Sequence, residues 1–383
     1  MSRIWKRPYF SGLIFGLAAA VSIGWLLLSD RGQGSGVRGQ GDRETGRGGD
    51  KETRDEGRAA SDEGREKKRE QFAADRDDVV FDAARAMTYL KDLCKIGPRI
   101  SGTEGMKKQQ EFLKKHFEGL GGKVEMQTFT AKQKSQPRPV DMANMIVSWH
   151  PERERRVILC SHYDTRPIAD QEQDRRKWQE PFLSANDGGS GVALLMEFAH
   201  QMKDLKTEAG VDFVFFDGEE YIFDPEPEHD KYFFGSEHFA RTYAKGKGQG
   251  SGARGQESGK RGQGQGTNRE AQVHYLGAVL LDMIGGKNPR FPIEQNSWFH
   301  AAALVEQLWR IAAAQGCDAF KVQEGPRVND DHIALNEARI PTVDIIDFDY
   351  PHWHRLSDLP ENCSGDSMYQ VSRVLTAWLK QIK

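Results

Sequence analysis

Four short, nearly continuous runs of apolar residues most constrain the fold of this chain. Runs of this length without polar alternation are typical of strands that are covered on both faces of a sheet. They occupy residues 157–160, 211–216, 278–281 and 342–346. Apolar residues recur with helical spacing in residues 103–119, 190–205, 297–315 and 367–382. Alternating strands and helices predict one three-layer α/β/α domain over residues 74–383, with a mixed, mostly parallel central sheet.

An uncharged segment near the N-terminus predicts a membrane anchor. Residues 8–29 contain no charged side chain, and three basic residues precede them. This length matches the roughly 20 residues that span a bilayer, and basic residues stay on the cytoplasmic side. We therefore expect a transmembrane helix within residues 1–30, with the rest of the chain on the periplasmic or extracellular side. A cleavable signal sequence, favoured by three alanines at 18–20, and a buried core helix are the alternatives.

Glycine and charged residues dominate two segments. Of the 40 glycines, ten lie in residues 31–73 and nine in residues 245–270. Such segments cannot bury enough apolar surface to offset chain entropy, which predicts a disordered tether and a low-complexity insertion in a surface loop. An RNA-binding patch is the alternative for the insertion, although it lacks the aromatic residues that stack on bases. The formal charge of −3 also argues against a nucleic-acid partner.

Histidines and carboxylates follow the predicted strands, and one more carboxylate lies in the Gly-rich turn 184–191, which opens a predicted helix. In chain order these residues are His162, Asp187, Glu219, Glu220, Asp282 and His354. Ligands of open α/β sheets bind beyond the carboxyl ends of the strands. We therefore expect these side chains to converge at one edge of the sheet.

Two adjacent glutamates at a buried strand end predict a metal ion. Buried carboxylates are costly unless a positive charge neutralises them. One of the two carboxylates can then coordinate a dication while its neighbour transfers protons as general base and acid. Histidine and carboxylate ligands without thiolates fit a catalytic zinc better than calcium, which prefers oxygen ligands. Asp164, two residues after His162, is expected to fix the tautomer of that imidazole.

The same residues resemble the motifs of the zinc-dependent aminopeptidase family M28, and most those of its glutaminyl cyclase branch. The motifs S-H-Y-D, N-D-x-x-S-G, D-G-E-E, L-L-D and W-H occur in the family's order. The resemblance covers residues 80–383 except the Gly-rich insertion. For the cyclases it implies one zinc, held by Asp187, Glu220 and His354. Glu219 would carry a proton from the α-amine of an N-terminal glutamine to the departing ammonia.

The two-zinc aminopeptidases of the family share this framework. For them the resemblance implies that His162 and Asp282 bind one zinc and that Glu220 and His354 bind the other. Asp187 would bridge the two ions, and Glu219 would activate water. All five ligands of a two-zinc site are present in this chain. The cyclase branch makes one zinc per chain the favoured prediction, and the five ligands leave two open.

Further positions favour the cyclase branch. Asp330 matches the carboxylate that helps to hold the amide and amine of the substrate, with Asp282 nearby, and Trp353 matches an indole that walls the glutamine pocket. Two positions depart from the animal cyclases, which have a tryptophan where Phe223 is the nearest substitute and a histidine where this chain has Asp344. The change at Phe223 affects the expected wall of the pocket. The change at Asp344 affects the expected hydrogen bonding behind that wall.

The resulting prediction is a glutaminyl-peptide cyclotransferase that acts on the N-termini of peptides and proteins. The first alternative is an M28 aminopeptidase with two zinc ions. The second is a catalytically silent zinc-fold module that binds partners at the cell envelope. Glu219 argues against the silent module, because loss of that glutamate would be its sequence signature.

Overall fold

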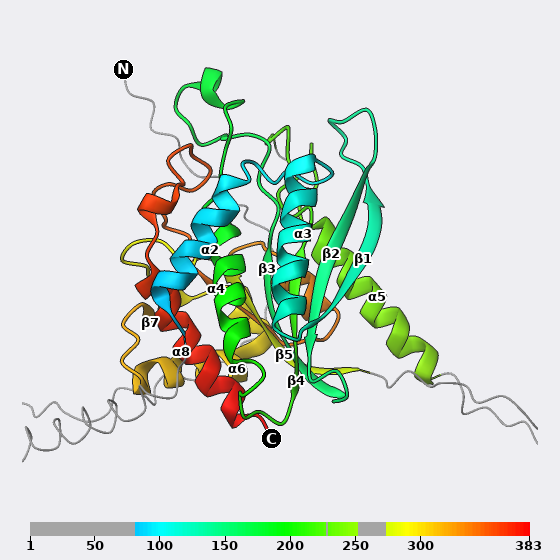
Figure 1. Ribbon diagram of the computed structural model, residues 1–383, viewed down its shortest axis with the longest axis vertical. Coiled ribbons are helices and arrows are strands. Elements are labelled where there is room, and N and C mark those ends of the chain that lie inside the picture. The colour runs from blue at the N-terminus through cyan, green and yellow to red at the C-terminus, as the bar shows by residue number, and fades with distance from the viewer. Residues whose placement is uncertain (1–80, 227–228, 252–272) are drawn as a thin grey trace, which may run out of the picture. The chain divides into compact units, whose positions relative to one another are not determined.

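The computed structural model describes residues 81–226, 229–251 and 273–383 (Figure 1). The predicted transmembrane helix, the predicted tether and residues 252–270 of the predicted insertion lie outside these ranges. In the part of the chain that is described, no helix combines the length and the apolar character needed to cross a membrane.

A mixed sheet of six strands forms the centre of the described fold, in the order β1-β2-β4-β3-β5-β8. Its members are β1 (Lys123–Ala131), β2 (Val140–Trp149), β3 (Arg155–His162), β4 (Gly210–Phe216), β5 (His274–Asp282) and β8 (Thr342–Ile346). Strands β4, β3, β5 and β8 pair in parallel, whereas β2 is antiparallel to β4 and to β1. The parallel strands are the four that the apolar runs predict, so the prediction of a mostly parallel sheet is confirmed.

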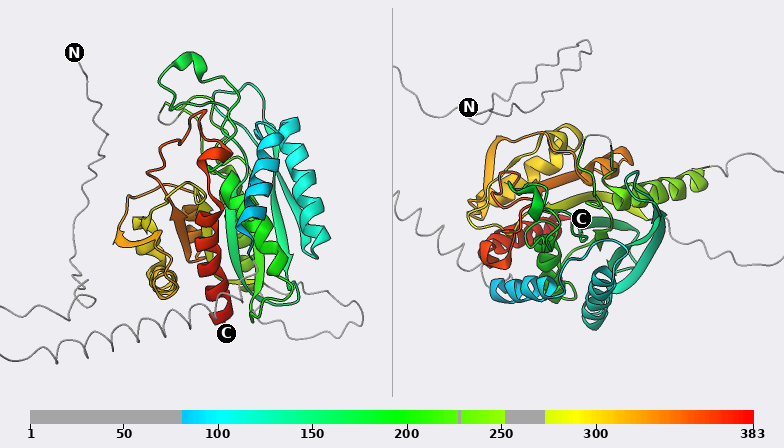
Figure 2. Two further views of the ribbon diagram at one scale, coloured as in Figure 1. Left: turned by 60° about the vertical axis from the view of Figure 1, so that its left-hand side comes forward. Right: turned by 90° about the horizontal axis from the view of Figure 1, so that it is seen from above.

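Helices cover both faces of this sheet (Figures 1 and 2). On one face lie α2 (Ala83–Lys95), α3 (Glu104–Gly119), α4 (Gly189–Phe198) and α8 (Gly365–Gln381). On the other lie α5 (Phe234–Ser251) and α7 (His332–Glu337). Helix α6 (Gln295–Ala314) packs against α8, β8 and a small parallel pair, β6 (Phe291–Ile293) with β7 (Phe320–Glu324). Short 3-10 helices are η2 (Arg175–Lys177), η3 (Ala199–Gln201) and η4 (Pro360–Asn362).

Strand β4 shows why the central strands are apolar throughout. Phe213 and Phe215 pack into the hydrophobic cluster under α2, α3 and α4. Val214 and Phe216 point the other way, into the cluster under α5 and α7. Side chains alternate between the faces of a strand, so a strand that is covered on both sides needs apolar residues at every position.

Three features of the fold differ from or extend the predictions. The helix predicted over 190–205 ends at Phe198 and continues only as the 3-10 helix η3, whose hydrogen bonds tighten from i+4 to i+3. Helix α5 runs to Ser251, so its last turns lie inside the predicted insertion. Strands β1 and β2 were not predicted; in β1, at the sheet edge, exposed and partly buried side chains largely alternate.

Candidate metal centre and active site

The predicted site residues meet at one edge of the sheet, beyond the carboxyl ends of its parallel strands. Strand β3 ends at His162, β5 ends at Asp282, and the turn with Glu219 and Glu220 follows β4. His354 lies in the loop between β8 and α8. All five side chains are buried. The predicted convergence of residues that lie far apart in the sequence is therefore confirmed.

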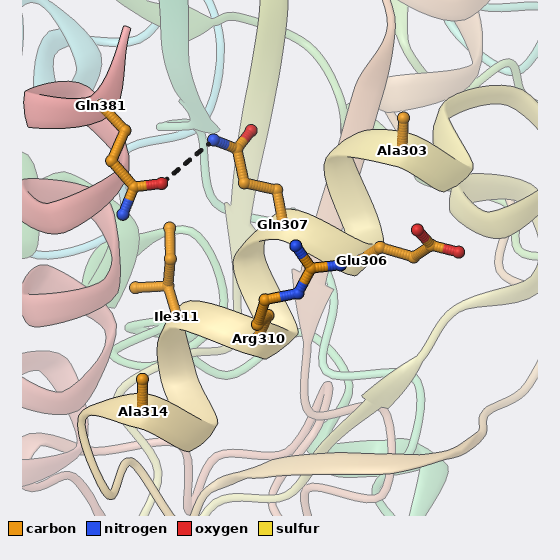
Figure 3. Close-up of a pocket in the computed structure, with 7 residues that line it drawn as sticks. All are labelled: Ala303, Glu306, Gln307, Arg310, Ile311, Ala314 and Gln381. Carbon is orange, nitrogen blue, oxygen red and sulfur yellow. Dashed lines mark hydrogen bonds between the residues drawn. The ribbon is translucent and has the colours of Figure 1, made fainter. Parts of the chain in front are cut away.

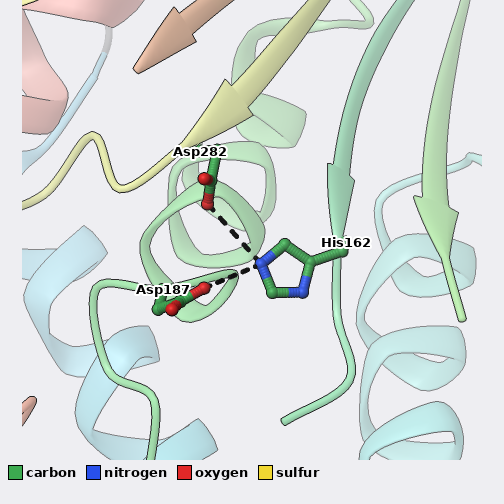
Figure 4. Close-up of side chains that lie close together, drawn as sticks. All are labelled: His162, Asp187 and Asp282. Carbon is green, nitrogen blue, oxygen red and sulfur yellow. Dashed lines mark hydrogen bonds and ion pairs between the residues drawn. The ribbon is translucent and has the colours of Figure 1, made fainter. Parts of the chain in front are cut away.

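His162, Asp187 and Asp282 form one compact trio (Figure 4). Nε2 of His162 lies 3.0 Å from Oδ1 of Asp187 and 3.5 Å from Oδ1 of Asp282. The imidazole comes from the end of β3, and the two carboxylates come from the end of β5 and the turn before α4. One donor atom of each residue lies within 4.8 Å of the others, which is close enough for a shared metal ion.

Asp187, Glu220 and His354 form a second trio that shares its aspartate with the first. Nε2 of His354 lies 2.5 Å from Oε1 of Glu220 and 3.5 Å from Oδ2 of Asp187. Asp187 faces the first trio with Oδ1 and the second trio with Oδ2. Its carboxylate is thus placed to bridge two ions, or to bind one ion in either half of the site.

Three buried carboxylate oxygens of the site have no hydrogen-bond partner, which bears on whether the site fits a cation. Oδ2 of Asp187, Oε2 of Glu220 and Oδ1 of Asp282 all lack a partner. A buried carboxylate oxygen in this state costs free energy, and a bound dication would remove that cost. The donors are imidazole nitrogens and carboxylate oxygens, the set that catalytic zinc prefers. The residues therefore fit zinc.

The Gly-rich turn before α4 holds Asp187 in place. Asp358 accepts hydrogen bonds from the backbone N–H groups of Asn186 (2.8 Å) and Asp187 (3.2 Å). Gly188 has a φ of +68°, and a Cβ at this position would lie 2.5 Å from Cε1 of His162. Glycine is required here both for the backbone conformation and for the space that the imidazole occupies.

Asp164 has a different main contact from the one that we predicted. Its Oδ1 lies 3.6 Å from Nδ1 of His162, and that nitrogen has no hydrogen-bond partner. Its carboxylate instead accepts the backbone N–H groups of Glu219 (3.2 Å) and Glu220 (3.0 Å). Asp164 is the carboxylate nearest to Nδ1 of His162, so its role in fixing the tautomer of that imidazole stays a prediction. Asp164 holds the turn that carries the two glutamates.

Burial and neighbouring charges give the two glutamates opposite protonation behaviour. Burial, together with the Glu220 carboxylate, raises the pKa of Glu219 well above its ordinary value. Burial also raises the pKa of Glu220, but His354 and Arg166 outweigh this effect and lower it to about 2. Glu219 therefore binds a proton more readily than an exposed glutamate does, while Glu220 stays ionised as a ligand must.

Asp330 lies just before α7 and belongs to the same acidic environment. Burial raises its pKa well above the ordinary value, and the carboxylates of Asp282 and Asp331 raise it further. Asp344 on β8 is fully buried, and burial with the charge of Asp330 raises its pKa as well. Asp330, His332 and Asp344 bring donor atoms within 4.8 Å of one another. A carboxyl that keeps its proton can donate a hydrogen bond to a substrate oxygen.

The two aromatic residues predicted to line the pocket lie in separate hydrophobic clusters. The ring of Trp353 packs on His354, with ring centroids 4.1 Å apart, and on Phe348 at 5.2 Å. Phe223 instead packs edge-on against Tyr221 at 4.9 Å, beside β1 and β2. The structure places Trp353 next to a predicted metal ligand, and it does not bring Phe223 to Trp353.

Two charged residues that sequence reasoning missed contact the predicted metal ligands. Nη1 of Arg166 donates a hydrogen bond to Oε1 of Glu220 at 3.5 Å. Oδ1 of Asp170 lies 3.1 Å from Nδ1 of His354. Both residues lie in the loop that follows β3. Their position shortly after His162 is a weak sequence signal for a place in the site. It is weak because Glu220 and His354, the residues they contact, lie in other loops.

A surface pocket of about 430 Å³ lies between α6 and α8 (Figure 3). Seven residues line it, and Gln307 on α6 donates a hydrogen bond to Gln381 on α8 at 3.3 Å. It shares no residue with either trio, and Glu306 is the only carboxylate among its lining residues. The pocket is therefore separate from the candidate metal centre.

Two histidine and carboxylate trios that share an aspartate, placed beside a buried glutamate of raised pKa, define a metal-dependent enzyme with an α/β fold. The family is shown by sequence comparison. The model of peptidase family M28 matches residues 144–379, and the chain belongs to that family. Family membership implies a zinc enzyme.

Three individual relatives show which proteins of known description this chain is similar to. A solved glutaminyl cyclase from Fimbriiglobus ruber is 50% identical, with a TM-score of 0.73 over 80% of this chain and 97% of that one. A solved protein from Bacteroides thetaiotaomicron, described as a leucine aminopeptidase precursor, is 29% identical, with a TM-score of 0.67 over 79% and 98%. A glutaminyl-peptide cyclotransferase-like protein from Bos taurus is 26% identical over 322 residues, which are 77% of this chain and 74% of its own.

Proposed function

We propose that this protein is a glutaminyl-peptide cyclotransferase, which converts the N-terminal glutamine of peptides to pyroglutamate and releases ammonia. The observation that carries the proposal is a pair of buried aspartates near the metal ligands, Asp282 at the end of β5 and Asp330 just before α7, whose charges interact. Cyclisation needs groups that hold both the amine and the amide of one residue close together. Similarity to the Fimbriiglobus ruber cyclase over most of both chains supports the same conclusion.

In this proposal Asp187, Glu220 and His354 hold one zinc. When bound there, zinc supplies a Lewis acid that polarises the γ-carboxamide oxygen of the substrate. Glu219 takes a proton from the α-amine as the amine nitrogen bonds to the γ-carbon. It then passes this proton to the amide nitrogen, whose bond to the γ-carbon breaks as ammonia leaves. The raised pKa of Glu219 suits both transfers.

The remaining site residues orient the glutamine. Asp330 keeps its proton and donates a hydrogen bond to the substrate amide, while Asp282 accepts one from the α-amine. Trp353 packs on His354 and offers an apolar wall to the glutamine methylene groups. Phe223 is a further candidate for the wall. Cyclisation consumes no water, so a site that holds the amine against the γ-carbon favours it over hydrolysis.

A two-zinc aminopeptidase is the second candidate. The trio of His162, Asp187 and Asp282 favours it, because it offers a complete set of donor atoms for another ion. Hydrolysis would then use Glu219 as the base that activates water. The count of zinc ions in the purified protein therefore separates the two candidates.

The experiment incubates the full chain with a Gln-initiated peptide and, separately, with leucine p-nitroanilide, and measures bound zinc. We expect ammonia release from the peptide, little nitroaniline and about one zinc per chain. Rapid nitroaniline release with about two zinc ions would instead identify the aminopeptidase. Zinc binding with neither activity would identify a silent binding module.

We also propose that residues 8–29 anchor the enzyme in a membrane, with the catalytic domain on the periplasmic or extracellular side. The support is the uncharged segment behind three basic residues. Cell fractionation and protease treatment of intact cells or spheroplasts test this proposal. A soluble mature protein whose N-terminus lies beyond residue 20 would instead identify a cleaved signal sequence.

A further inference from the structure

We propose that Arg166 and Asp170 are positioning residues that hold two metal ligands, His354 and Glu220, in their binding geometry. Both lie in the loop after β3 and are buried, with 1% and 7% of their side chains exposed. They would make the trio of Asp187, Glu220 and His354 the tighter half of the metal site. The inference rests on the proposed function only in its choice of this trio as the zinc site.

Asp170 supports the imidazole of His354 from behind. Its Oδ1 lies 3.1 Å from Nδ1 of His354, while Nε2 of the same ring faces Glu220 and Asp187. A carboxylate at Nδ1 keeps the proton on that nitrogen and leaves the lone pair of Nε2 free for a metal. It also makes the imidazole a more basic ligand.

Arg166 links the two ligands through one guanidinium group. Its Nε lies 2.9 Å from Oδ1 of Asp170, and its Nη2 donates to Oδ2 of the same carboxylate at 3.1 Å. Its Nη1 donates to Oε1 of Glu220 at 3.5 Å. Nη2 also donates to the hydroxyl of Tyr232 at 3.0 Å, and the Tyr232 ring lies 5.4 Å below the guanidinium. Arginine suits this role because its planar fork contacts both carboxylates at once.

In the other half of the site the corresponding contact is longer. The carboxylates nearest to Nδ1 of His162 are Asp164 at 3.6 Å and Glu219 at 3.7 Å, whereas Asp170 lies 3.1 Å from Nδ1 of His354. Asp164 already accepts two backbone N–H groups. His162 is therefore held less well as a ligand than His354. The first zinc should bind at the His354 half.

Zinc affinity, measured without substrate, tests the inference. Competition with a fluorescent chelator gives the zinc dissociation constant of the full chain and of D170N, D170A and R166M. We expect the constant to rise about 10- to 100-fold in D170A and R166M, and less in D170N, whose amide oxygen still accepts a hydrogen bond. The double variant R166M/D170A should lose little more than either single variant, because both residues act through one unit.

A distant buried ion pair supplies the matched control. Arg156 and Asp212 are also paired at 2.6 Å, with 3% of each side chain exposed, near the start of β3 and β4. D212N should lower stability and leave the zinc dissociation constant unchanged. In the NMR spectrum of the zinc-loaded protein, the Nδ1 proton of His354 should give a downfield signal that D170A removes.

Wild-type zinc affinity in both D170N and D170A would overturn the inference, as would an unchanged imidazole signal. If D170A does not fold, D170N and R166M still decide the result. Zinc affinity is measured independently of turnover, so failure of cyclase activity in the wild-type protein would overturn the proposed function and leave this test intact.

Discussion

One carboxylate oxygen of Asp164 lies 3.0 Å from the backbone nitrogen of Glu220 and accepts its N–H group. The other oxygen accepts the N–H of Glu219 at 3.2 Å. Asp164 is fully buried, so no water replaces these bonds. The position of both the metal ligand and the proton carrier thus depends on a residue from the end of the neighbouring strand β3.

Replacing Asp164 should therefore reduce both stability and activity. D164A leaves two buried N–H groups unpaired, and we expect it to lower the free energy of unfolding by about 3 kcal/mol. Displacement of the glutamates should lower kcat about 100-fold. D164N keeps one acceptor oxygen and should lose about half as much stability. Urea unfolding of the metal-free protein measures the effect, and unchanged unfolding of D164A would contradict the role of Asp164.

Replacing Glu219 by glutamine should remove the proton transfer and leave the metal in place. The amide has nearly the same shape as the carboxyl but cannot take up a proton at neutral pH. We expect kcat to fall about 100- to 10,000-fold. Bound zinc should stay at the wild-type level, because Glu219 is not one of the proposed ligands. A variant with kcat within a few-fold of wild type would exclude Glu219 as the proton carrier.

Zinc binding to the metal-free protein should release protons. Burial and Arg166 lower the pKa of His354, but Glu220 and Asp170 outweigh them and raise it to about 9. Burial and Glu220 raise the pKa of Asp187 to about 7. Both groups must lose their protons to bind zinc, so about one to two protons should leave per zinc near pH 7. Zinc affinity should rise with pH and level off above about pH 9.

Calorimetric titration with zinc, in buffers of different ionisation enthalpy, counts these protons. The released protons bind to the buffer, so the observed heat should change with the buffer. The same heat in every buffer would show that the ligands are already deprotonated. It would also contradict the raised pKa of His354.

The glycine at position 188 should not tolerate a side chain. Its φ is +68°, and a Cβ would overlap the His162 ring at 2.5 Å. We expect G188A to lower the free energy of unfolding by about 2 kcal/mol or more. Gly119, the last residue of α3, has open space at its Cβ position. G119A should change stability by less than about 0.5 kcal/mol, and equal losses in both variants would refute the steric argument.

The sequence allowed the central strands to be predicted because burial on both faces leaves a continuous apolar run, as in β4. Strand β1 was missed because Lys123 and Glu125 lie on an exposed sheet edge and break that pattern. The ends of the central strands, together with the motif order, were enough to predict which site residues converge. Their convergence follows from parallel pairing, which brings strand ends to one edge.

The contacts that surround the site residues could not be predicted in the same way. Arg166 and Asp170 follow His162 in the sequence, yet they contact Glu220 and His354 from other loops. Asp164 lies beside its sequence neighbour His162 as predicted, but its hydrogen bonds to the turn after β4 were not predicted. Spacing along one segment identifies groups with a given chemistry, whereas their partners depend on how separate loops pack.

The most direct test of the central claim follows the origin of the oxygen atoms in the product. The full chain is incubated with a Gln-initiated peptide in water enriched in heavy oxygen, and the products are analysed by mass spectrometry. Cyclisation joins the substrate amine to its own γ-carbon, so the account predicts pyroglutamyl peptide without heavy oxygen and an equal amount of ammonia. Free glutamine that carries heavy oxygen in its carboxyl group would show hydrolysis of the first peptide bond and would contradict the account.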